Sequence, residues 1–477
     1  MKKLHFLLYL FLSITTILTA QEVSRKGAHQ QQLIELGSTQ KVPSKFAANG
    51  SGIIKLEAKE TNTLSKIIFG FLPYWEYANG AHNNLHYSLL THIAAFNFQT
   101  SSTGAITNPP GWPWTDVINA AHSNGVKIIM VVNNFTASEI NTLLTNNVSK
   151  TNLFNAIKNT IATYQLDGVN IDFEGLNTSD RGALLNTFMA DLTGFIHTNI
   201  PGKEVSFDSP AVNWSGWDLN GLAQSVDYLF IMAYDYNGSW STITGAVAPL
   251  THPSGGISVT NSLNNDYSAP IANAPEKLIL GVPYYGKHWK TSSSSAGASI
   301  TSYVGSTFYR NTAIEAATHG GNIWDTNSQT PFYSWLAGGW NQVWADNEQS
   351  IALKYDLAIN KNLGGIGIWA LNYDGNRSEL WNLIDAKFNN TLAVDDFVLQ
   401  QQISIYPNPT ENFLNIATTQ NLEIATIEIF NIYGQQLKSY PPNSRRINIG
   451  HYKNGIYFLK IKDVNRRRAA FKIIKSP

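Results

Sequence analysis

The chain has 477 residues, enough for about three average domains or for one large barrel with smaller neighbours. Its 33 basic and 33 acidic residues balance, and charged residues make up only 14% of the chain, so a nucleic-acid-coating protein and a charged disordered chain are both disfavoured. All 13 tryptophans lie between Trp75 and Trp381. This concentration predicts an aromatic-lined binding cleft in the middle of the chain, and we expect no nucleic acid as a partner.

Cysteine is absent, which excludes disulfide scaffolds, thiolate nucleophiles, cysteine-ligated zinc and iron–sulfur clusters. At the N-terminus two lysines precede an apolar run over residues 4–18, and the following Leu-Thr-Ala suits cleavage before Gln21. We therefore expect residues 1–20 to be a signal peptide and the protein to be secreted or held at the cell surface. An uncleaved N-terminal anchor is the alternative. No later stretch reaches the ~20 apolar residues of a spanning helix, so we expect no membrane span.

Residues 21–64 are polar, without sustained periodicity or tryptophan, and are interpreted as a leader or linker to which we assign no fold. From Lys66 onward, short runs of β-branched and aromatic residues alternate with helix-like segments, which indicates βαβ units on a parallel sheet. The candidate strands are Ile67–Leu72, His92–Phe98, Lys127–Asn133, Gly168–Phe173, Glu204–Asp208, Tyr228–Tyr234, Lys277–Pro283 and Gly365–Trp369.

Eight such strands predict an α/β fold, a (β/α)8 TIM barrel over residues 65–390. A doubly wound open sheet is the alternative, but no Gly-x-Gly-x-x-Gly turn follows the first strand. The clearest helix is expected from Asp180 to Ile200, where apolar residues recur at three- and four-residue spacing. The stretch from Tyr284 to Trp344 is too long for an ordinary loop, and it predicts a small insertion after the seventh strand or a wall of the cleft.

The composition changes after Asn390. Residues 391–401 are expected to be a linker, and residues 402–477 contain short strand-like runs between Asn, Gly and Pro turns, which predicts a small β-sandwich. Residues 401–477 hold 11 Lys or Arg against 4 Asp or Glu. A basic tail on an acidic body fits a separately folding module that could be removed, and a merely solvated basic face is the alternative.

The most informative residues, DGVNIDFE at 167–174, end the fourth candidate strand. Because side chains alternate across a strand, Asn170, Asp172 and Glu174 share one face. In a barrel this face points inward and toward the C-terminal mouth, where enzymes of this fold carry their chemistry, with Glu174 outermost. Three buried polar groups would cost several kcal/mol if unpaired, so a functional site explains them better than packing does.

An ion-pair network or a metal site is the alternative reading of these carboxylates. A metal site would need further His or carboxylate ligands, and the 11 histidines form no HExxH or comparable pair, so we expect neither a metal nor a cofactor. Two neighbouring carboxylates fit acid–base catalysis, in which burial and the neighbouring charge keep one of them protonated.

DGVNIDFE resembles the DxxDxDxE signature of the family 18 glycoside hydrolases, the chitinases and their relatives. Further segments resemble that family's motifs in the same order along residues 66–388. They are MAYD at 232–235, KLILGVPYYG at 277–286, VWAD at 343–346 followed by Ser350 and Lys354, and GGIGIW at 364–369.

The resemblance implies substrate-assisted retention, in which the substrate's own 2-acetamido carbonyl attacks the anomeric carbon. Glu174 would protonate the glycosidic oxygen, and Asp172 would bind the acetamido N–H. Tyr234 and Asp235 would hold the reactive sugar above a floor formed by Trp369. Further side chains expected to contact substrate are Phe71, Trp75, Met232, Tyr284 and Tyr285.

Two positions depart from the family pattern. Asn170 stands where the signature has a second acid, and Val131-Val132-Asn133-Asn134 replaces the usual Ser-x-Gly-Gly of the third strand. The Asn form resembles the branch with chitobiases and spore-cortex N-acetylglucosaminidases. We expect the Asn170 amide to donate a hydrogen bond to Asp172 and thereby to favour the ionised carboxylate.

The functional hypothesis is a secreted, monomeric hydrolase that cleaves β-1,4-linked N-acetylglucosamine polymers, chitin or chito-oligosaccharides. Within the enzymes, the alternative is an N-acetylglucosaminidase that acts on peptidoglycan or N-glycans. A chitin-binding lectin on an inactive barrel is a third hypothesis, but such proteins generally lose the acid that is retained here as Glu174.

The tail carries a second resemblance. ISIYPNPT at 403–410, Tyr433-Gly434, Gly455-Ile456-Tyr457 and a lysine-rich final strand resemble the C-terminal sorting domain of type IX secretion cargo in Bacteroidetes. This implies the secretion machinery as a partner. A carbohydrate-binding sandwich is the alternative, weakened because the tail has no tryptophan for stacking on sugars.

Overall fold

The computed structural model describes residues 26–37, 42–56, 64–389, 399–419, 422–432, 435–464 and 468–477. The expected signal peptide at 1–20, most of the expected linker at 391–401, and the Tyr433-Gly434 pair lie outside the described residues. No helix in the described ranges is both long enough and apolar enough to cross a membrane.

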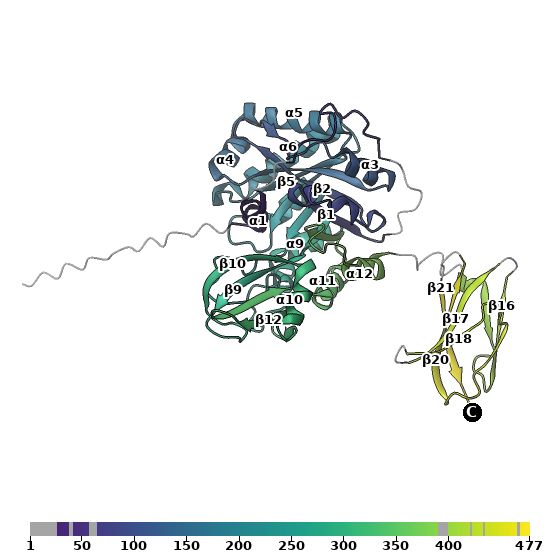
Figure 1. Ribbon diagram of the computed structural model, residues 1–477. Coiled ribbons are helices and arrows are strands. Elements are labelled where there is room, and N and C mark those ends of the chain that lie inside the picture. The colour runs from purple at the N-terminus through teal and green to yellow at the C-terminus, as the bar shows by residue number, and fades with distance from the viewer. Residues whose placement is uncertain are drawn as a thin grey trace, which may run out of the picture.

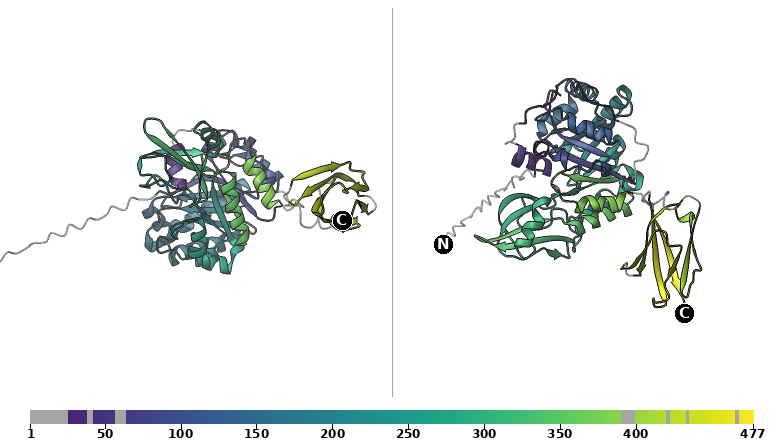
Figure 2. Two further views of the ribbon diagram at one scale, coloured as in Figure 1. Left: turned by 90° about the horizontal axis from the view of Figure 1, so that it is seen from below. Right: turned by 45° about the vertical axis from the view of Figure 1, so that its right-hand side comes forward.

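Eight parallel strands close a barrel within the described part of the chain (Figures 1 and 2). The barrel is closed because β1 pairs with β2 on one side and with β14 on the other. The expected (β/α)8 fold is thereby confirmed, and the expected strands differ from the observed ones only at their ends. The barrel strands are β1 (Ile67–Pro73), β2 (His92–Thr100), β4 (Lys127–Asn134), β5 (Gly168–Phe173), β6 (Glu204–Pro210), β7 (Tyr228–Met232), β8 (Leu278–Pro283) and β14 (Gly365–Trp369), with β3 (Ile106–Thr107) added antiparallel to β2.

Helices surround the barrel. They are α2 (Tyr74–Ala78), α3 (Thr115–Ser123), α4 (Ala137–Thr145), α5 (Asn147–Tyr164), α6 (Ala183–Asn199), α7 (Leu219–Ser225), α8 (Val259–Asn261), α9 (Ser268–Asn273), α11 (Glu348–Asn360) and α12 (Glu379–Phe388). The expected helix at 180–200 is α6, and its apolar stripe, including Phe188 and Leu192, is buried. It starts later than expected because Thr178–Asp180 forms a separate 3-10 turn.

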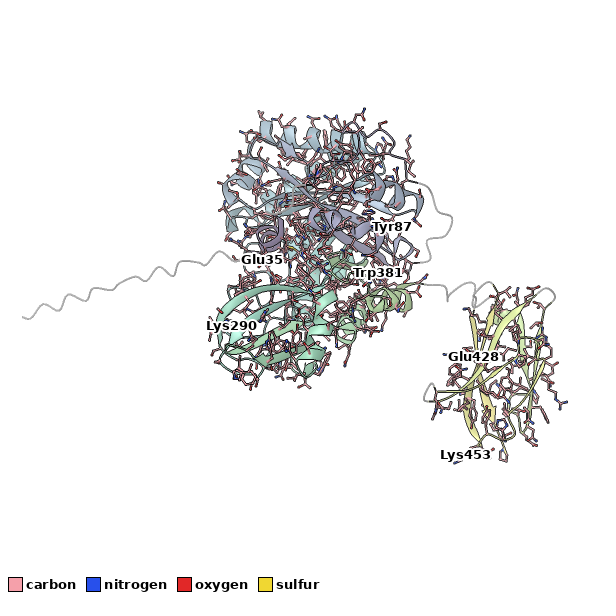
Figure 3. All side chains as sticks on the ribbon, in the orientation of Figure 1. Glu35, Tyr87, Lys290, Trp381, Glu428 and Lys453 are labelled. Carbon is pink, nitrogen blue, oxygen red and sulfur yellow. The ribbon has the colours of Figure 1, made fainter. Side chains whose placement is uncertain are left out.

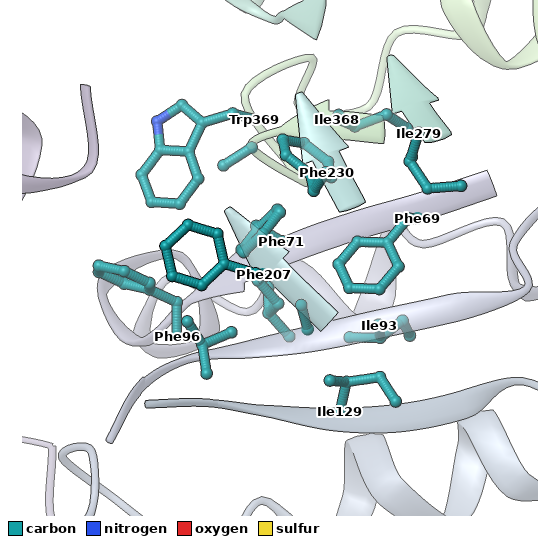
Figure 4. Close-up of a cluster of buried hydrophobic side chains, with 14 of the residues drawn as sticks. Phe69, Phe71, Ile93, Phe96, Ile129, Phe207, Phe230, Ile279, Ile368 and Trp369 are labelled. Atoms are coloured by element: carbon teal, nitrogen blue, oxygen red, sulfur yellow. The ribbon is translucent and has the colours of Figure 1, made fainter. Parts of the chain in front are cut away.

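Large apolar side chains fill the barrel, as Figure 4 shows for the cluster around Phe71, Phe230 and Trp369. Gly367 makes this packing possible, because a Cβ atom there would overlap the ring of Phe230. Trp369 follows two positions later on the same face of β14, where it reaches the mouth of the barrel. The GGIGIW sequence therefore combines a small residue in the interior with a large aromatic residue at the rim.

The insertion expected after the seventh strand is a separate sheet with one helix. Its five strands are antiparallel, in the order β10-β9-β13-β12-β11. The elements are β9 (Tyr285–Thr291), β10 (Ile300–Phe308), α10 (Tyr309–Thr318), β11 (Ile323–Asp325), β12 (Thr330–Leu336) and β13 (Trp340–Ala345). Strand β9 begins two residues after β8 ends, so the insertion starts directly at the barrel mouth.

The C-terminal region is the expected small β-sandwich, with two antiparallel sheets around one apolar core. One sheet contains β15 (Ile403–Tyr406), β16 (Phe413–Thr418) and β19 (Arg446–Asn448). The other contains β17 (Ile424–Asn431), β18 (Gln436–Tyr440), β20 (Gly455–Asp463) and β21 (Arg468–Lys475). Leu414 and Ile447 of the first sheet share the core with Ile427 and Leu459 of the second.

The segment before the barrel contains a helix where sequence analysis assigned none. This helix, α1 (Ala28–Leu36), lies between the barrel and the sheet that carries β9 and β10 (Figures 1 and 2). Polar side chains make many of the contacts of this helix. Its sequence, AHQQQLIEL, therefore shows little of the apolar periodicity by which helices are predicted. Residues 42–56 run over the outside of the barrel, where Tyr164 donates to the carbonyl of Ala48 at 2.8 Å.

A buried carboxylate ties three elements together at the start of β5. Asp167 accepts hydrogen bonds from the His122 ring at 2.9 Å, from the Ile128 backbone N–H at 2.9 Å and from Lys203 at 3.0 Å. Burial alone would raise the pKa of Asp167, but these hydrogen bonds and nearby positive charges hold it below its usual value. This carboxylate therefore links α3, β4 and the chain entering β6.

We predict that Asp167→Ala lowers the free energy of unfolding by about 3 kcal/mol at pH 7, because it leaves buried donors without an acceptor. The difference in unfolding free energy between the intact chain and Asp167→Ala should reach its full size above pH ~4 and shrink at lower pH. A carboxyl group whose pKa is lower in the folded state stabilises the fold only while it is ionised there. Denaturant titration measures both effects. The control, Asp191→Ala, removes an exposed partner of Lys150 and should change stability by less than ~1 kcal/mol.

Candidate active site

Carboxyl groups from neighbouring strands gather at the mouth of the barrel. Asn170 and Asp172 are fully buried on β5, and Glu174, just beyond its end, is 7% exposed. Asp208 of the adjacent β6 is equally buried and lies close enough for its charge to interact with that of Asp172. The alternation expected for β5 thus brings its three polar residues to one interior face.

The expected hydrogen bond from Asn170 to Asp172 is wrong. The Asn170 amide instead donates to Asp208 at 2.9 Å and to Ser206 at 3.1 Å. The reason is geometric, because residues two apart on a strand are farther from each other than residues paired across neighbouring strands. Asn170 is paired in register with Ser206 of β6. Asn170 therefore acts on the Asp208 carboxyl directly and not on that of Asp172.

The carboxyl group of Glu174 is buried, and no hydrogen bond from the described residues offsets its loss of contact with water. Neither of its carboxyl oxygens has a hydrogen-bond partner among the described residues. Burial, followed by the negative charge of Asp172, raises the pKa of Glu174 to about 8, although the nearby His29 opposes the shift. Burial and Asp172 also raise the pKa of Asp208 well above its usual value, against the hydrogen bond from Asn170. At neutral pH, Glu174 is therefore a carboxylic acid that can give up a proton.

Tyr234 and Asp235 follow β7 and complete one side of the site. Burial, and then the charge of Asp208, raises the pKa of Tyr234 well above its usual value, so the phenol keeps its proton. Asp235 has a φ of 53°, a left-handed conformation that aspartate tolerates better than most residues. The inserted sheet holds its carboxylate, since Tyr285 donates to it at 2.5 Å and the Lys287 ammonium lies 3.7 Å away.

Trp369 forms an aromatic floor beside the carboxyl groups. Its ring centroid lies 5.5 Å from that of Phe71 and 5.1 Å from that of Phe96, which meets it edge-on. Trp75 stands behind this layer, with its ring 5.8 Å from Phe96 and its indole N–H donating to Tyr373 at 3.2 Å. The three expected aromatic residues Phe71, Trp75 and Trp369 thus belong to one connected group, of which Figure 4 labels Phe71, Phe96 and Trp369.

One residue expected to contact substrate is placed differently. The Tyr284 hydroxyl lies 3.1 Å from that of Tyr355 on α11, outside the barrel. Tyr284 lies in the bend between β8 and β9, whereas the hydroxyl of its neighbour Tyr285 donates to Asp235 at the mouth. Met232, at the end of β7, is half-buried against the barrel core, and its contact with substrate stays a prediction. We therefore remove Tyr284 from the candidate site.

His29 of α1 enters the same space. Its ring is fully buried and stacks on Trp369 with the ring centroids 3.7 Å apart. One ring nitrogen lies 3.0 Å from Asp172 and the other 2.8 Å from the Tyr234 hydroxyl. His29, Asp172 and Asp208 also form a group whose nitrogen and oxygen atoms could surround a metal ion. In this structure, however, the ring nitrogen already bonds Asp172 directly.

Several residues of the site were not identified from sequence. Asp208 could have been found, since it is an acidic residue at the C-terminal end of a predicted barrel strand. Lys287 lies on the inserted sheet, whose position against the mouth no local pattern predicts. His29, which occupies the site without belonging to the barrel, had no signal, because 143 residues separate it from Asp172 along the chain.

The barrel, with acid–base groups at its C-terminal mouth, has the architecture of the TIM-barrel enzymes. The model of the family named Glycosyl hydrolases family 18 matches residues 67–374, more than half of the chain. The chain therefore belongs to family 18 of the glycosyl hydrolases. A second family, the secretion system C-terminal sorting domain, matches residues 404–476, which indicates a protein that is secreted or held at the cell surface.

Curated relatives include the di-N-acetylchitobiases of Homo sapiens and Mus musculus. Each is 31% identical, over 48% and 43% of this chain, and the matches cover 66% and 61% of those proteins. The chain thus spans less than two thirds of the length of these relatives. The cortical fragment-lytic enzyme of Bacillus subtilis is 24% identical over 63% of this chain and 68% of its own length.

Solved structures share the fold. A chitinase from Cycas revoluta in complex with (GlcNAc)4 has a TM-score of 0.60 at 20% identity, covering 67% of this chain and 99% of that one. The Bacillus cereus spore cortex-lytic enzyme has a TM-score of 0.57 at 20% identity, covering 68% of this chain and 74% of its own.

We predict that the carboxyl group of Glu174 has a pKa of about 8 in the intact chain, well above that of an ordinary glutamate. Carbon-13 NMR of chain labelled at the glutamate carboxyls can follow this titration, and the signal is assigned by its loss in Glu174→Gln. A Glu174 signal that titrates below pH 6 would contradict the described burial of this group.

Proposed function

We propose that the chain is a secreted glycoside hydrolase that cleaves β-1,4-linked N-acetylglucosamine polymers with retention, through substrate-assisted catalysis. The observation that carries this proposal is the Glu174 carboxyl, buried and without a hydrogen-bond partner among the described residues, with its pKa raised to about 8 beside Asp172. A group of this kind is suited to donate a proton to a leaving oxygen at neutral pH.

In the first step, Glu174 gives its proton to the glycosidic oxygen while the bond from that oxygen to the anomeric carbon breaks. The carbonyl oxygen of the substrate's own acetamido group forms a new bond to the same carbon, which produces a cyclic oxazolinium ion. The free oxygen of Asp172 accepts the acetamido N–H, and its negative charge stabilises the positive charge that develops.

The remaining residues position the sugar. The protonated Tyr234 hydroxyl can donate to the acetamido carbonyl, and Trp369 supports the apolar face of the ring. In the second step, Glu174, now a carboxylate, takes a proton from water as the water oxygen attacks the anomeric carbon. The acetamido group re-forms, and the product keeps the β configuration because the carbon has been inverted twice.

A second candidate is an N-acetylglucosaminidase that acts on peptidoglycan. It is supported by the cortical fragment-lytic enzyme of Bacillus subtilis, which matches 63% of this chain, whereas the probable chitinase 2 of Drosophila melanogaster, which matches 69%, supports the first candidate. The catalytic steps above would be the same on either polymer, because both present an N-acetylated sugar on the non-leaving side of the bond. The two candidates differ only in the subsites that lie farther from Glu174.

We predict that Glu174→Gln lowers kcat by about 10²–10⁴-fold, the effect of losing a general acid, while the binding of oligosaccharide substrate is largely kept. Initial rates on chitin oligosaccharides measure the loss. Glu276→Gln is the matched control, because Glu276 is exposed and lies before β8, at the opposite end of the strand from the mouth. A Glu174→Gln enzyme within a few-fold of the unaltered chain would remove Glu174 from the mechanism.

We also predict that proton NMR of fresh hydrolysis product shows the β-anomer first, as retention requires. Running chitin oligosaccharides and peptidoglycan side by side, with identification of the new reducing ends, separates the two candidate substrates. Initial release of the α-anomer would rule out the substrate-assisted route on whichever polymer is cut.

A further inference from the structure

The cleft of the barrel is occupied by the chain's own helix α1. The helix lies against the barrel mouth on one side and the inserted sheet on the other (Figures 1 and 2). Figure 3 labels Glu35 of α1 at this border and Lys290 on the sheet. Tyr303 of β10 donates to the Glu35 carboxylate at 2.9 Å, which ties the helix to the insertion.

His29 makes the contacts that the proposed mechanism assigns to the sugar next to the cut bond. Its ring stacks on Trp369, which forms the floor in that mechanism. It also bonds Asp172, which would accept the acetamido N–H, and Tyr234, which would donate to the acetamido carbonyl. The neighbouring Gly27 lies so close to Glu174 that a Cβ atom on it would overlap the carboxyl group. No sugar ring can share this space with the imidazole.

The charge of the site suits a cation at this position. Besides Asp172, the His29 ring nitrogen lies 3.7 Å from Glu174 and 3.8 Å from Asp208. Burial alone would lower the pKa of His29, but the charge of Asp172 and its hydrogen bond to the ring raise it above its usual value. An imidazolium is planar, five-membered and positive, with an N–H toward Asp172, and the oxazolinium ion has the same four properties.

Gln32, one turn further along the helix, fixes the orientation of α1. Its side-chain oxygen accepts hydrogen bonds from the Trp369 indole at 2.9 Å and from the Tyr373 hydroxyl at 2.7 Å. At the end of the helix, the Tyr74 hydroxyl donates to the carbonyl of Gly37 at 2.5 Å. The contacts therefore run along the whole helix and involve side chains at the barrel mouth.

We propose that α1 is an intramolecular inhibitor in which His29 mimics the cationic reaction intermediate, so that substrate binds only after α1 has left the cleft. This inference rests on the proposed function for the identity of the sugar position, and on the described contacts for the occlusion. A helix of nine residues is marginal by itself in water, so its order depends on docking. Its covalent attachment provides a high local concentration, which favours the docking of so short a helix.

The first experiment compares steady-state kinetics of the intact chain with those of the double variant His29→Ala, Gln32→Ala. An internal competitor raises the apparent KM and leaves kcat unchanged, so we expect the double variant to lower KM at least about tenfold with the same kcat. The matched control is Ile34→Ala, on the same helix but with its side chain 50% exposed. An unchanged KM, or a change confined to kcat, would overturn the proposal.

The second experiment does not require hydrolysis. We expect the backbone amides of residues 28–36 to be protected from hydrogen exchange in the intact chain and in Ile34→Ala, and to lose protection in the double variant or with saturating (GlcNAc)3. Fast exchange of this segment in the intact chain would overturn the docking. Protected amides that (GlcNAc)3 leaves protected, although it binds, would overturn the competition.

The two proposals fail in different ways. If no variant hydrolyses or binds an N-acetylglucosamine oligomer, while protection of α1 is still lost only in the double variant, the proposed function is wrong and the occlusion of the cleft stands. If the intact chain hydrolyses such an oligomer with the same KM as the double variant, the proposed function stands and the inhibition is overturned.

Discussion

The arrangement of the cleft depends on several carboxyl groups sharing one desolvated space. Asp172, Glu174 and Asp208 are at most 7% exposed, and Asp235 lies close enough to add its charge. Carboxyl groups this close together cannot all ionise, so some keep their protons and others are stabilised by hydrogen bonds or a neighbouring cation. Glu174 and Asp208 respond with raised pKa values, Asp235 is held by Tyr285 and Lys287, and His29 supplies a cation.

The scaffold makes this crowding possible by supplying the groups from several different elements. Strands β5 and β6 bring the carboxyl groups to the mouth, and Trp369 closes the floor because Gly367 leaves room for Phe230 beneath it. The insertion begins immediately after β8, so its first strand can reach Asp235. The apolar barrel core thus fixes the positions of polar groups that would repel one another if they were free to move.

An electrostatic arrangement that favours a cation in one place also determines what can occupy the empty cleft. A site built to stabilise a positive intermediate will accept another flat cation of similar size, provided that it is delivered there. In this chain, helix α1 delivers an imidazole ring. Occlusion of the cleft and the proposed catalysis therefore depend on the same charges.

The sequence by itself determined the barrel, the end of each strand to within a few residues, and the grouping of Asn170, Asp172 and Glu174. These follow from periodicity and alternation, which are local properties of the chain. The partner of Asn170, the outward side chain of Tyr284, the contribution of Lys287 and the presence of His29 were decided only by tertiary structure. Each depends on which side chain stands across a neighbouring strand or domain, and segments that meet in this way are separated by up to several hundred residues. Local sequence patterns do not predict contacts between such distant segments. The contacts of α1 are largely polar, so its sequence has no apolar stripe from which they could be predicted.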